Sequence, residues 1–313
     1  MPDGVTCVGG LTADVLAIPV HVFPAPATQE LTDEVRLAPG GCAVNAASAL
    51  ACLGVPARLI ARTGDDAVGD FLRQVLSQRG VDISGLRRTS DAGTPASIVF
   101  VMENGERCML HAIGSMRTFS EDDIDWDVAA RSRIFFVAQA LQLPAFDGEP
   151  MRAALERARS LGMHTAMDVG WDTTGAWSRR IEACYPLLDY FVPSWNEARE
   201  MTGESDPPAM CRFFHDRGVG TVGIKLGAEG CHISGPEGEF HLAAFPVQVR
   251  DTLGAGDAWC AGFLTGVLRG MPLAEAGRFA NAVGACCVSH NGSYDGIRSM
   301  ADTLAFMHEG GQR

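Results

Sequence analysis

Short apolar runs alternate with helix-periodic segments along most of the chain. The apolar runs have the length and composition of buried β-strands, and they cover residues 5–10, 55–62, 133–137, 164–168, 188–192 and 221–225. Segments with helical spacing lie between them, at residues 64–80, 151–161, 177–184 and 208–217. Because strands that alternate with helices usually join a parallel sheet, this order predicts an α/β fold with a doubly wound, mostly parallel sheet.

Two other stretches have a different pattern and predict a second, smaller sheet. Residues 16–37 are broken by prolines and end in a partly alternating run at 30–37, typical of a half-exposed strand. Residues 97–101 and 107–112 flank an Asn104-Gly105 pair, and Asn-Gly between apolar runs is a strong hairpin signal. We expect a single domain over residues 1–313, with segments at roughly 15–38 and 90–114 inserted in it as a small sheet. An ordinary edge hairpin would give the same local pattern.

The composition is that of an ordinary globular protein, with 47% hydrophobic and 20% charged residues. The 38 acidic residues outnumber the 25 Lys and Arg, which gives a net charge of −13. Because no basic cluster stands out, the charge argues against nucleic acid and against an anionic membrane surface as partners. The sequence contains no signal peptide, no membrane-length apolar run and no Cys-x-x-Cys pair, so we expect a cytoplasmic protein with reduced thiols.

Residues 251–258, Asp-Thr-Leu-Gly-Ala-Gly-Asp-Ala, carry the clearest chemistry. They follow a strand-like run at 246–249 and lead into a helical run at 258–268. Gly254 and Gly256 let the backbone approach a ligand closely, and the N–H groups at a helix start bind anions. Asp257 falls in the first turn, where the helix dipole favours its ionised form, and such a carboxylate can accept the proton of a hydroxyl that attacks a phosphate. A capped helix with packing glycines is the structural alternative.

A second glycine-rich helix start lies at residues 39–47. Gly40 and Gly41 precede a helix of small residues that continues to Leu53, and Asn45 lies one turn into it. Asp14 follows the first strand, at the carboxyl end of the sheet, where open α/β sheets bind ligands. Asp14 and Asn45 are therefore candidates to face one ligand. The structural alternatives are a turn acid and an incidental Asn in a tightly packed Ala-rich helix.

Both stretches resemble signatures of the PfkB, or ribokinase-like, carbohydrate kinases. Residues 251–257 match the family pattern D-T-x-G-A-G-D without a departure, and residues 40–45 match G-G-x-x-x-N. The resemblance covers nearly the whole chain and implies an ATP-dependent kinase with a ribokinase-like fold, a lid formed by the small sheet and a homodimer through that lid. It assigns the anion hole to Gly254, Ala255 and Gly256, and the role of catalytic base to Asp257. It implies that the sugar hydroxyls are bound by Asp14, Gly40, Gly41 and Asn45.

Further motifs bear on the metal and the nucleotide. Ser194 and Glu197 have the spacing of a capping box. By resemblance, Glu197 also falls on the family's N-x-x-E motif, whose Glu helps to hold Mg²⁺ and phosphates, partly through water; Ser194 stands where the family usually has Asn. The resemblance makes Asp251 a candidate ligand of a monovalent cation such as K⁺. It assigns the nucleotide to Lys225, Gly227, Gly230, Thr252 and Asn281, the last of which would otherwise be a helix-surface amide.

The residues expected around the acceptor argue against ribose and against a sugar phosphate. Cys42 stands where ribokinases proper carry Lys, and residues 139–142 contain no acid where they use a Glu on the sugar. A phosphorylated acceptor needs cationic groups, so we expect a neutral sugar or a sugar acid. The cations nearest the small sheet are Arg36, Arg107 and Arg117. The alternatives are a nucleoside kinase of the same family and an inactive sugar-binding regulator, and the intact Asp257 argues against the second.

Overall fold

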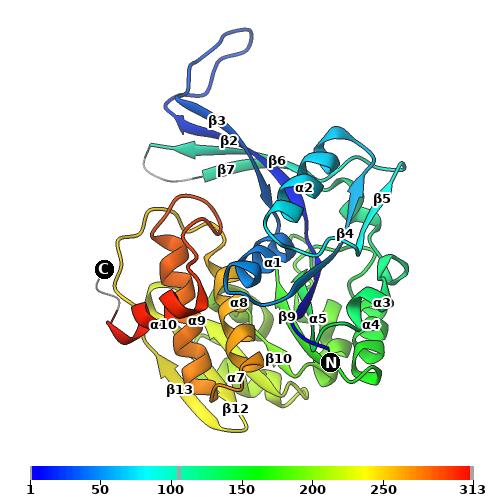
Figure 1. The fold of residues 1–313 in the computed structure, drawn as a ribbon, viewed down its shortest axis with the longest axis vertical. Coiled ribbons are helices and arrows are strands. Elements are labelled where there is room, and N and C mark those ends of the chain that lie inside the picture. Colours follow the sequence, from blue (N-terminus) through cyan, green and yellow to red (C-terminus); the bar gives the residue numbers. More distant parts are fainter. Residues whose placement is uncertain (1, 104–106, 311–313) are drawn as a thin grey trace.

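The computed structural model describes residues 2–103 and 107–310, and its strands form two sheets (Figure 1). The larger sheet has nine strands in the order β13-β12-β11-β10-β9-β8-β1-β4-β5. Neighbouring strands from β11 to β5 are parallel, whereas β12 and β13 are added as an antiparallel edge. The predicted mostly parallel sheet is therefore confirmed. Its strands are β1 (Val5–Gly9), β4 (Ala57–Gly64), β5 (Leu86–Thr89), β8 (Ile134–Ala140), β9 (His164–Val169), β10 (Tyr190–Phe191), β11 (Thr221–Lys225), β12 (Cys231–Gly235) and β13 (Gly238–Leu242).

Helices cover both faces of this sheet and create two hydrophobic cores (Figure 1). The strand β1 contributes Val5 and Cys7 to one core and Val8 to the other, because successive side chains of a strand point to opposite faces. The α-helices are α1 (Cys42–Cys52), α2 (Ala67–Gln78), α3 (Trp126–Ala129), α4 (Glu149–Ser160), α5 (Ser178–Ile181), α6 (Trp195–Thr202), α7 (Pro207–His215), α8 (Ala255–Leu268), α9 (Leu273–Val288) and α10 (Met300–His308). Short 3₁₀ helices lie at Gly114–Thr118, Glu121–Asp123, Glu182–Leu187 and Gly227–Glu229.

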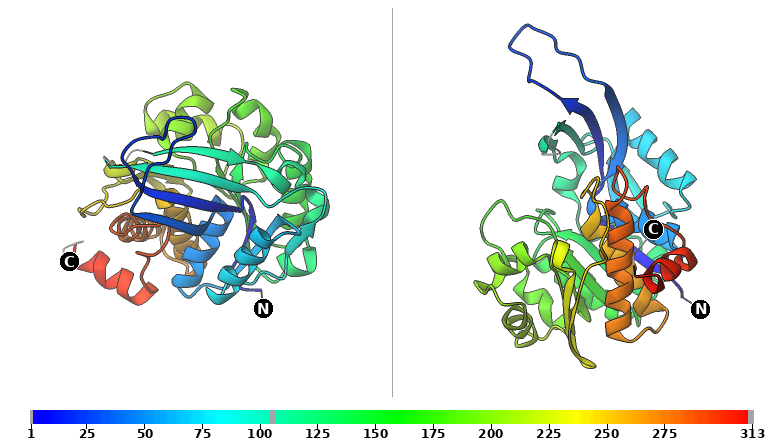
Figure 2. Two further views of the ribbon diagram at one scale, coloured as in Figure 1. Left: turned by 90° about the horizontal axis from the view of Figure 1, so that it is seen from above. Right: turned by 90° about the vertical axis from the view of Figure 1, so that its left-hand side faces the viewer.

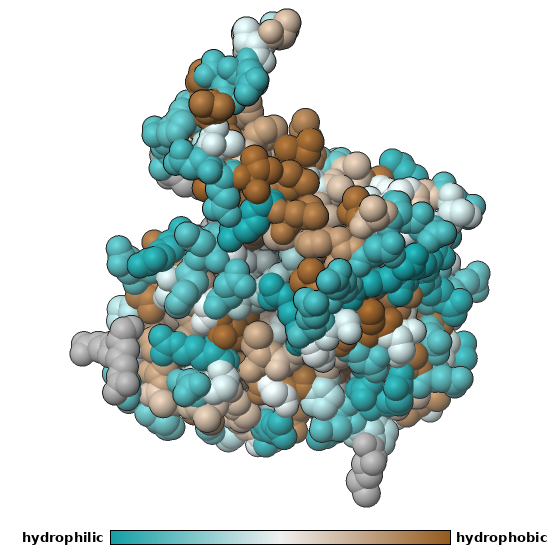
Figure 3. All heavy atoms as spheres, turned by 45° about the horizontal axis from the view of Figure 1, so that its top comes forward, coloured by the Kyte–Doolittle hydropathy of each residue, from teal (hydrophilic) through white to brown (hydrophobic). Residues whose placement is uncertain are grey.

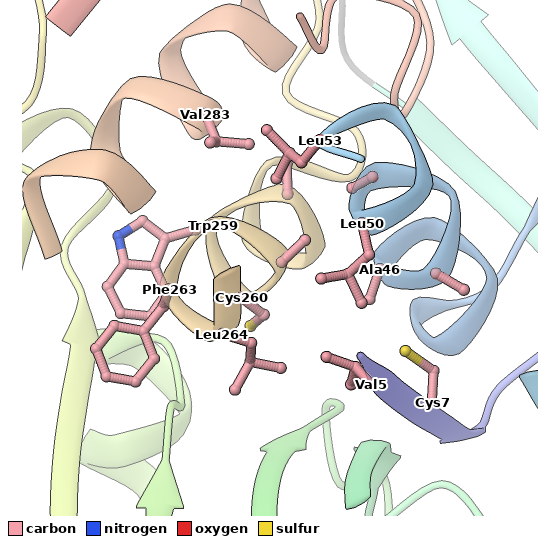
Figure 4. Close-up of a cluster of buried hydrophobic side chains, with 14 of the residues drawn as sticks. Val5, Cys7, Ala46, Leu50, Leu53, Trp259, Cys260, Phe263, Leu264 and Val283 are labelled. Atoms are coloured by element: carbon pink, nitrogen blue, oxygen red, sulfur yellow. The ribbon is translucent and has the colours of Figure 1, made fainter. Parts of the chain in front are cut away.

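The first core packs α1 and α9 against α8 (Figure 4). In this view Leu50 and Leu53 of α1 and Val283 of α9 point toward α8. Glycine permits the close approach of α9, since a Cβ at Gly262 of α8 would lie 2.9 Å from the Cα of Ala280. This packing fixes the starts of α1 and α8 relative to each other, and both starts carry a predicted glycine signature.

The smaller sheet, which we call the lid, projects from one end of the molecule (Figures 1 and 2). It has four strands in the order β3-β2-β6-β7: β2 (Thr12–Val20), β3 (Glu34–Gly40), β6 (Ala96–Met102) and β7 (Arg107–Ala112). This confirms the predicted small sheet separate from the main one. The predicted Asn104-Gly105 turn lies outside the described residues, and the strands on either side of it pair antiparallel, with Ala96 opposite Ala112.

Asp14 and the run at 246–249 differ from the prediction. Asp14 lies inside β2 of the lid rather than in a connection at the end of β1, because the chain enters the lid sheet two residues after Gly10. The run at 246–249 forms no strand. Pro246 has no amide hydrogen for a sheet ladder, and the run instead lines a cavity described below.

The predicted helix at 177–184 and the edge of the main sheet also differ. The helix divides into α5 and the 3₁₀ helix Glu182–Leu187, because Pro186 cannot donate an α-helical hydrogen bond. The hairpin of β12 and β13 was not predicted, since its strands are short and mixed in polarity. Among the described residues, every helix is too short or too polar to form a transmembrane span.

Candidate active site

The glycine signature at 254–256 forms the start of α8, as predicted. Gly254 is the N-cap with a φ of 73°, and a Cβ there would lie 2.4 Å from the carbonyl oxygen of Ser293. Both the backbone conformation and the close approach of the loop that contains Ser293 therefore require glycine at this position. The Ala255 amide donates a long hydrogen bond (3.3 Å) to the Thr252 carbonyl, while Gly256 and Asp257 follow in the first turn, where helix amides have no partner within the helix.

Asp251 holds this turn in place. Its Oδ1 accepts a hydrogen bond from the Leu253 amide (2.7 Å), and its Oδ2 accepts one from the Gly292 amide (2.9 Å). The carboxylate thereby links the turn before α8 to the loop that contains Ser293. Asp251 is buried, and both of its oxygen atoms contact backbone.

Asp257 lies against Asn45, which is 212 residues away in sequence. The Asn45 Nδ2 group donates a 2.9 Å hydrogen bond to Asp257 Oδ2. Burial raises the pKa of Asp257, and the Asn45 hydrogen bond and the charge of Lys225 oppose this shift. The desolvation of this partly buried carboxylate therefore outweighs the helix dipole, which the sequence analysis expected to favour the ionised form.

Gly40 and Gly41, predicted to bind the acceptor, make close contacts before the start of α1, and Gly40 packs against Asp14. A Cβ at Gly40 would lie 2.1 Å from Asp14 Oδ2, and a Cβ at Gly41, whose φ is 92°, would lie 2.6 Å from the Gly10 carbonyl oxygen. Asp14 Oδ1 and Asn45 Oδ1 are buried and have no hydrogen-bond partner among the described residues. Burial also raises the pKa of Asp14. Buried oxygen atoms without a partner are costly unless a ligand supplies one, and a hydroxyl is such a ligand.

Asp14 and Asp257 line different cavities. A large cavity of about 1150 Å³ contains Asp257, Glu197, Cys42 and Trp171 on its wall. A smaller one of about 210 Å³ contains Asp14 with Arg36. Of the other two lid-side arginines, the Arg107 side chain lies outside the described residues, and Arg117 lies in the 3₁₀ helix Gly114–Thr118 and on none of these walls.

A third cavity, of about 420 Å³, is mainly apolar and touches the large one. Its apolar wall includes Phe245, Pro246, Val247 and Val288. All of the predicted nucleotide residues line it: Lys225, Gly227, Gly230, Thr252 and Asn281. The large and the apolar cavity have a common boundary at the start of α8, formed by Lys225, Gly227, Thr252, Ala255 and Gly256.

Asn281 is buried rather than on a helix surface. Its Nδ2 group donates to the carbonyl oxygens of Leu242 (2.9 Å) and Ala243 (3.1 Å), and its Oδ1 accepts from Trp259 Nε1 (2.9 Å). The alternative reading as a surface amide is wrong. The side chain contributes to the cavity by fixing the segment after β13 that forms part of the wall.

Glu197 forms the predicted capping box and also lines the large cavity. Glu197 Oε2 accepts hydrogen bonds from the Ser194 amide (2.7 Å) and hydroxyl (2.6 Å), and Ser194 Oγ accepts from the Glu197 amide (3.3 Å). Burial and the charge of Asp168 raise the pKa of Glu197. The described residues contain no group of three or more His, Cys, Asp or Glu side chains arranged to bind a metal.

Asp168 is a site residue that the sequence analysis missed. It is the penultimate residue of β9 and lines the large cavity, and its Oδ2 accepts a 2.6 Å hydrogen bond from Lys225 Nζ. The signal was available, because Asp168 is an acid at the carboxyl end of a predicted parallel strand, where ligands bind.

Comparison with known proteins identifies the family. The family model of the pfkB family carbohydrate kinases matches residues 3–300. The chain belongs to this family. The pfkB kinase described here is 33% identical over 270 residues to the aminoimidazole riboside kinase of Salmonella typhimurium (82% of this chain, 83% of the relative), and 27% identical over 314 residues to the ribokinase of Haemophilus influenzae (98% and 99%). A solved structure of Arabidopsis thaliana ribokinase with ribose and ATP has the same fold, with a TM-score of 0.85 at 22% identity over 98% of this chain and 99% of that one. This pfkB kinase is therefore a sugar or nucleoside kinase, a transferase with an alcohol group as acceptor.

Proposed function

We propose that this protein uses ATP to phosphorylate a hydroxyl group of a sugar or sugar acid, with Asp257 as the base. The common boundary of the two cavities at the start of α8 is the observation that carries the proposal. A phosphoryl group that moves from the apolar cavity to the large one passes the amides of residues 254–256, which would form its anion hole. Asp257 lies on the large cavity, where the acceptor hydroxyl would stand.

The chain's own residues would carry out each step. The base of ATP would occupy the apolar cavity between Phe245, Val247 and Val288, with its phosphates at the common boundary. Asp257 would accept the hydroxyl proton while the acceptor oxygen attacks the γ-phosphorus and the bond to ADP breaks. A partly buried aspartate with a raised pKa is better matched to this task near neutral pH than an exposed one. The amides of the α8 start would stabilise the charge on the transferred group.

Glu197 is the candidate ligand for Mg²⁺. This ion is commonly bound by one or two carboxylates together with phosphates and water, so a single cavity-lining carboxylate fits it without a cage of three side chains. When bound, Mg²⁺ would neutralise charge on the phosphates. For K⁺, the candidate is Asp251, a buried carboxylate next to the turn before α8.

The acceptor would be bound by the two buried oxygen atoms without partners. Asp14 Oδ1 and Asn45 Oδ1 would each accept a hydrogen bond from a hydroxyl, which suits a sugar with free hydroxyl groups. Arg36 lines the cavity that contains Asp14, and its Nε has no hydrogen-bond partner among the described residues, with Glu34 Oε1 at 3.7 Å as its ion-pair partner. This arrangement favours a sugar that carries a carboxylate.

A nucleoside is the second candidate acceptor, and Trp171 is the observation that favours it. Trp171 lines the large cavity, is 49% exposed and is held edge-on by Trp177 with ring centroids 4.9 Å apart. An aromatic ring fixed in this way can stack on a base. A nucleoside with kcat/KM far above that of every sugar, lost in Trp171→Ala, would establish this alternative.

The outer face of the lid supports a homodimer. The strand registers place Leu37, Val15, Ile98 and Leu110 in one row across the four strands, and Val35, Ala17, Phe100 and Cys108 in the next. Leu110 and Val35 are 66% and 67% exposed, and Figure 3 shows apolar side chains gathered on the lid. An exposed apolar sheet face of this kind marks an interaction surface, and a second lid offers a matching one. Light scattering should give a dimer that Leu110→Lys converts to a monomer with unchanged Tm.

A coupled ADP-release screen across sugars, sugar acids, sugar phosphates and nucleosides tests the proposed function. We expect one sugar or sugar acid to be turned over well above the ATP hydrolysis without acceptor, and Asp257→Asn to abolish that turnover. Tight sugar binding without any turnover would instead establish an inactive regulator. A sugar phosphate as the best substrate would contradict the proposed acceptor class, and Arg36 would then be the first residue to replace.

A further inference from the structure

Lys225 is the only lysine among 313 residues, and the other 24 of the 25 Lys and Arg are arginines. A chain that uses arginine at every other basic position has a lysine at the end of β11. Lysine carries a compact charge with three donors, whereas the planar guanidinium of arginine needs more space. The composition therefore points to a position where a small ammonium group is required.

The ammonium group of Lys225 lies at the boundary between the large and the apolar cavity. An ideal Cβ built on Gly256 would be 3.5 Å from Lys225 Nζ, so the charge stands beside the first turn of α8. Among the described residues that line these two cavities, Lys225 is the one Lys or Arg, and it lines both. In the glycine-rich stretch at residues 39–47, the position after Gly41 carries no cation. It is occupied by Cys42, a thiol whose pKa is raised well above its usual value by burial.

Asp168 fixes this ammonium group. Asp168 Oδ2 accepts from Lys225 Nζ at 2.6 Å and from Cys260 Sγ at 3.3 Å, while Asp168 Oδ1 accepts from the Val169 amide at 2.9 Å. The pair is buried, with side-chain exposures of 11% for Lys225 and 6% for Asp168. Burial opposes the charge on Lys225, and the charge of Asp168 more than compensates, so the pKa of Lys225 is raised. The lysine therefore stays protonated and has little rotational freedom.

We propose that Lys225 is a catalytic cation that contacts the transferred phosphoryl group, and that Asp168 is the positioning residue that holds it beside the anion hole. This inference rests on the proposed function. Lys225 keeps its proton throughout: it stabilises charge on the phosphoryl oxygens, and Asp257 alone accepts the proton of the acceptor. Asp168, Glu197 and Asp257 also line the large cavity, so a fixed cation beside the anion hole would offset their repulsion of the incoming phosphates.

The single lysine makes a direct test possible. Protein produced with ¹³C,¹⁵N-lysine gives one lysine side-chain signal, that of Lys225, with no need for any acceptor to be turned over. We expect the non-hydrolysable analogue AMP-PNP with Mg²⁺ to shift this signal, and AMP, which lacks the γ-phosphate, to shift it much less. Equal shifts with AMP and AMP-PNP, or no shift, would overturn the contact. If the contact holds and no acceptor is phosphorylated, the proposed function fails and the nucleotide contact stands.

The variant Asp168→Asn tests the positioning role. Five titratable side chains surround Lys225 from four elements: Asp168, Cys42, Glu197, Asp257 and Cys260. Without the Asp168 charge, burial dominates and the pKa of Lys225 falls, so kcat should decline as the pH rises through the new value, with the KM for ATP changed less than threefold. The lysine ¹³Cε shift of the labelled variant should follow the same pH dependence.

Asp147→Asn is the matched control. Asp147 is another buried acid, paired with Arg180 at 2.8 Å, but it lines neither cavity. Both of its oxygen atoms accept hydrogen bonds from backbone amides, and asparagine has only one such oxygen, so Asp147→Asn should lower Tm without a change in the pH profile of kcat. The double variant Lys225→Met/Asp168→Asn removes the whole pair and leaves no buried unpaired charge, so it should fold and lose about 10²-fold or more in kcat. A wild-type pH profile in Asp168→Asn, or a double variant with wild-type kcat, would refute the proposal.

Discussion

Replacing the proposed base by its isostere, Asp257→Asn, should make the protein more stable and almost inactive. The asparagine Oδ1 can still accept the hydrogen bond that Asn45 Nδ2 donates at 2.9 Å, so the local geometry is kept. Removal of a general base typically costs about 10²–10⁴-fold in rate, or about 3–5 kcal/mol of transition-state stabilisation. We expect kcat to fall by that factor, with little change in the KM for ATP.

The stability gain follows from the raised pKa of Asp257. In the unfolded chain the carboxyl group ionises at its normal value, whereas in the folded chain burial raises the pKa. The wild-type protein therefore loses stability as the pH rises from the unfolded value through the folded value, by about 1.4 kcal/mol for each pKa unit of the shift. Asparagine has no charge to desolvate, so the gain in Tm should be small near pH 4 and larger at pH 7.

Calorimetry of both proteins between pH 4 and pH 8, with the coupled ADP-release assay in parallel, checks this prediction. A difference in Tm that grows with pH, together with the loss of kcat, supports a buried base. A Tm difference that is constant or reversed in sign would refute the assignment of burial as the dominant effect. Wild-type turnover in the asparagine variant would refute the role of Asp257 as base.

Three further predictions concern the residues around this centre. Glu197→Gln should change the free energy of unfolding by about 1 kcal/mol or less, because Gln also closes a capping box, while the Mg²⁺ concentration for half-maximal rate rises severalfold. An unchanged Mg²⁺ titration with a lowered Tm would show a purely structural role. Gly254→Ala should cost about 1–2 kcal/mol for the left-handed backbone and more for the contact with Ser293, and should weaken ADP binding in calorimetry; normal ADP affinity would argue against the anion hole. Arg36→Gln should lower kcat/KM for sugar acids by about 10-fold or more, the loss expected for one charged hydrogen bond, and leave neutral sugars unaffected; equal losses for both classes would count against a carboxylate site.

The parts of the site that were predictable depend on local backbone chemistry. Gly254 and Gly41 both have positive φ next to a helix start, and only glycine adopts that conformation easily, so the sequence marks these positions directly. Asp257 and Asn45 were predictable as residues one turn into those helices. The sheet and the lid followed from the spacing of apolar runs.

The parts that were missed depend on contacts between distant segments. Lys225 and Asp168 are 57 residues apart and lie on β11 and β9, which β10 separates in the sheet, so no local pattern pairs them. The pKa of Asp257 depends on burial by several elements, which outweighs the helix dipole that the sequence does show. The run at 246–249 has the apolar composition of a strand, and only the three-dimensional structure shows that it lines a cavity.

The outer face of the lid has a consequence for thiol chemistry. Of the ten free cysteines, Cys52 and Cys108 are exposed, Cys42 is partly buried and the other seven are buried. Cys108 stands on the lid face next to Phe100, whereas Cys52 lies at the far end of α1. Alkylation by iodoacetamide should therefore modify these two positions first, and pairing of two lids should slow Cys108 alone. The ratio of the two rates therefore measures lid pairing, and oxidants should modify these two exposed thiols before the less exposed thiols around the catalytic centre.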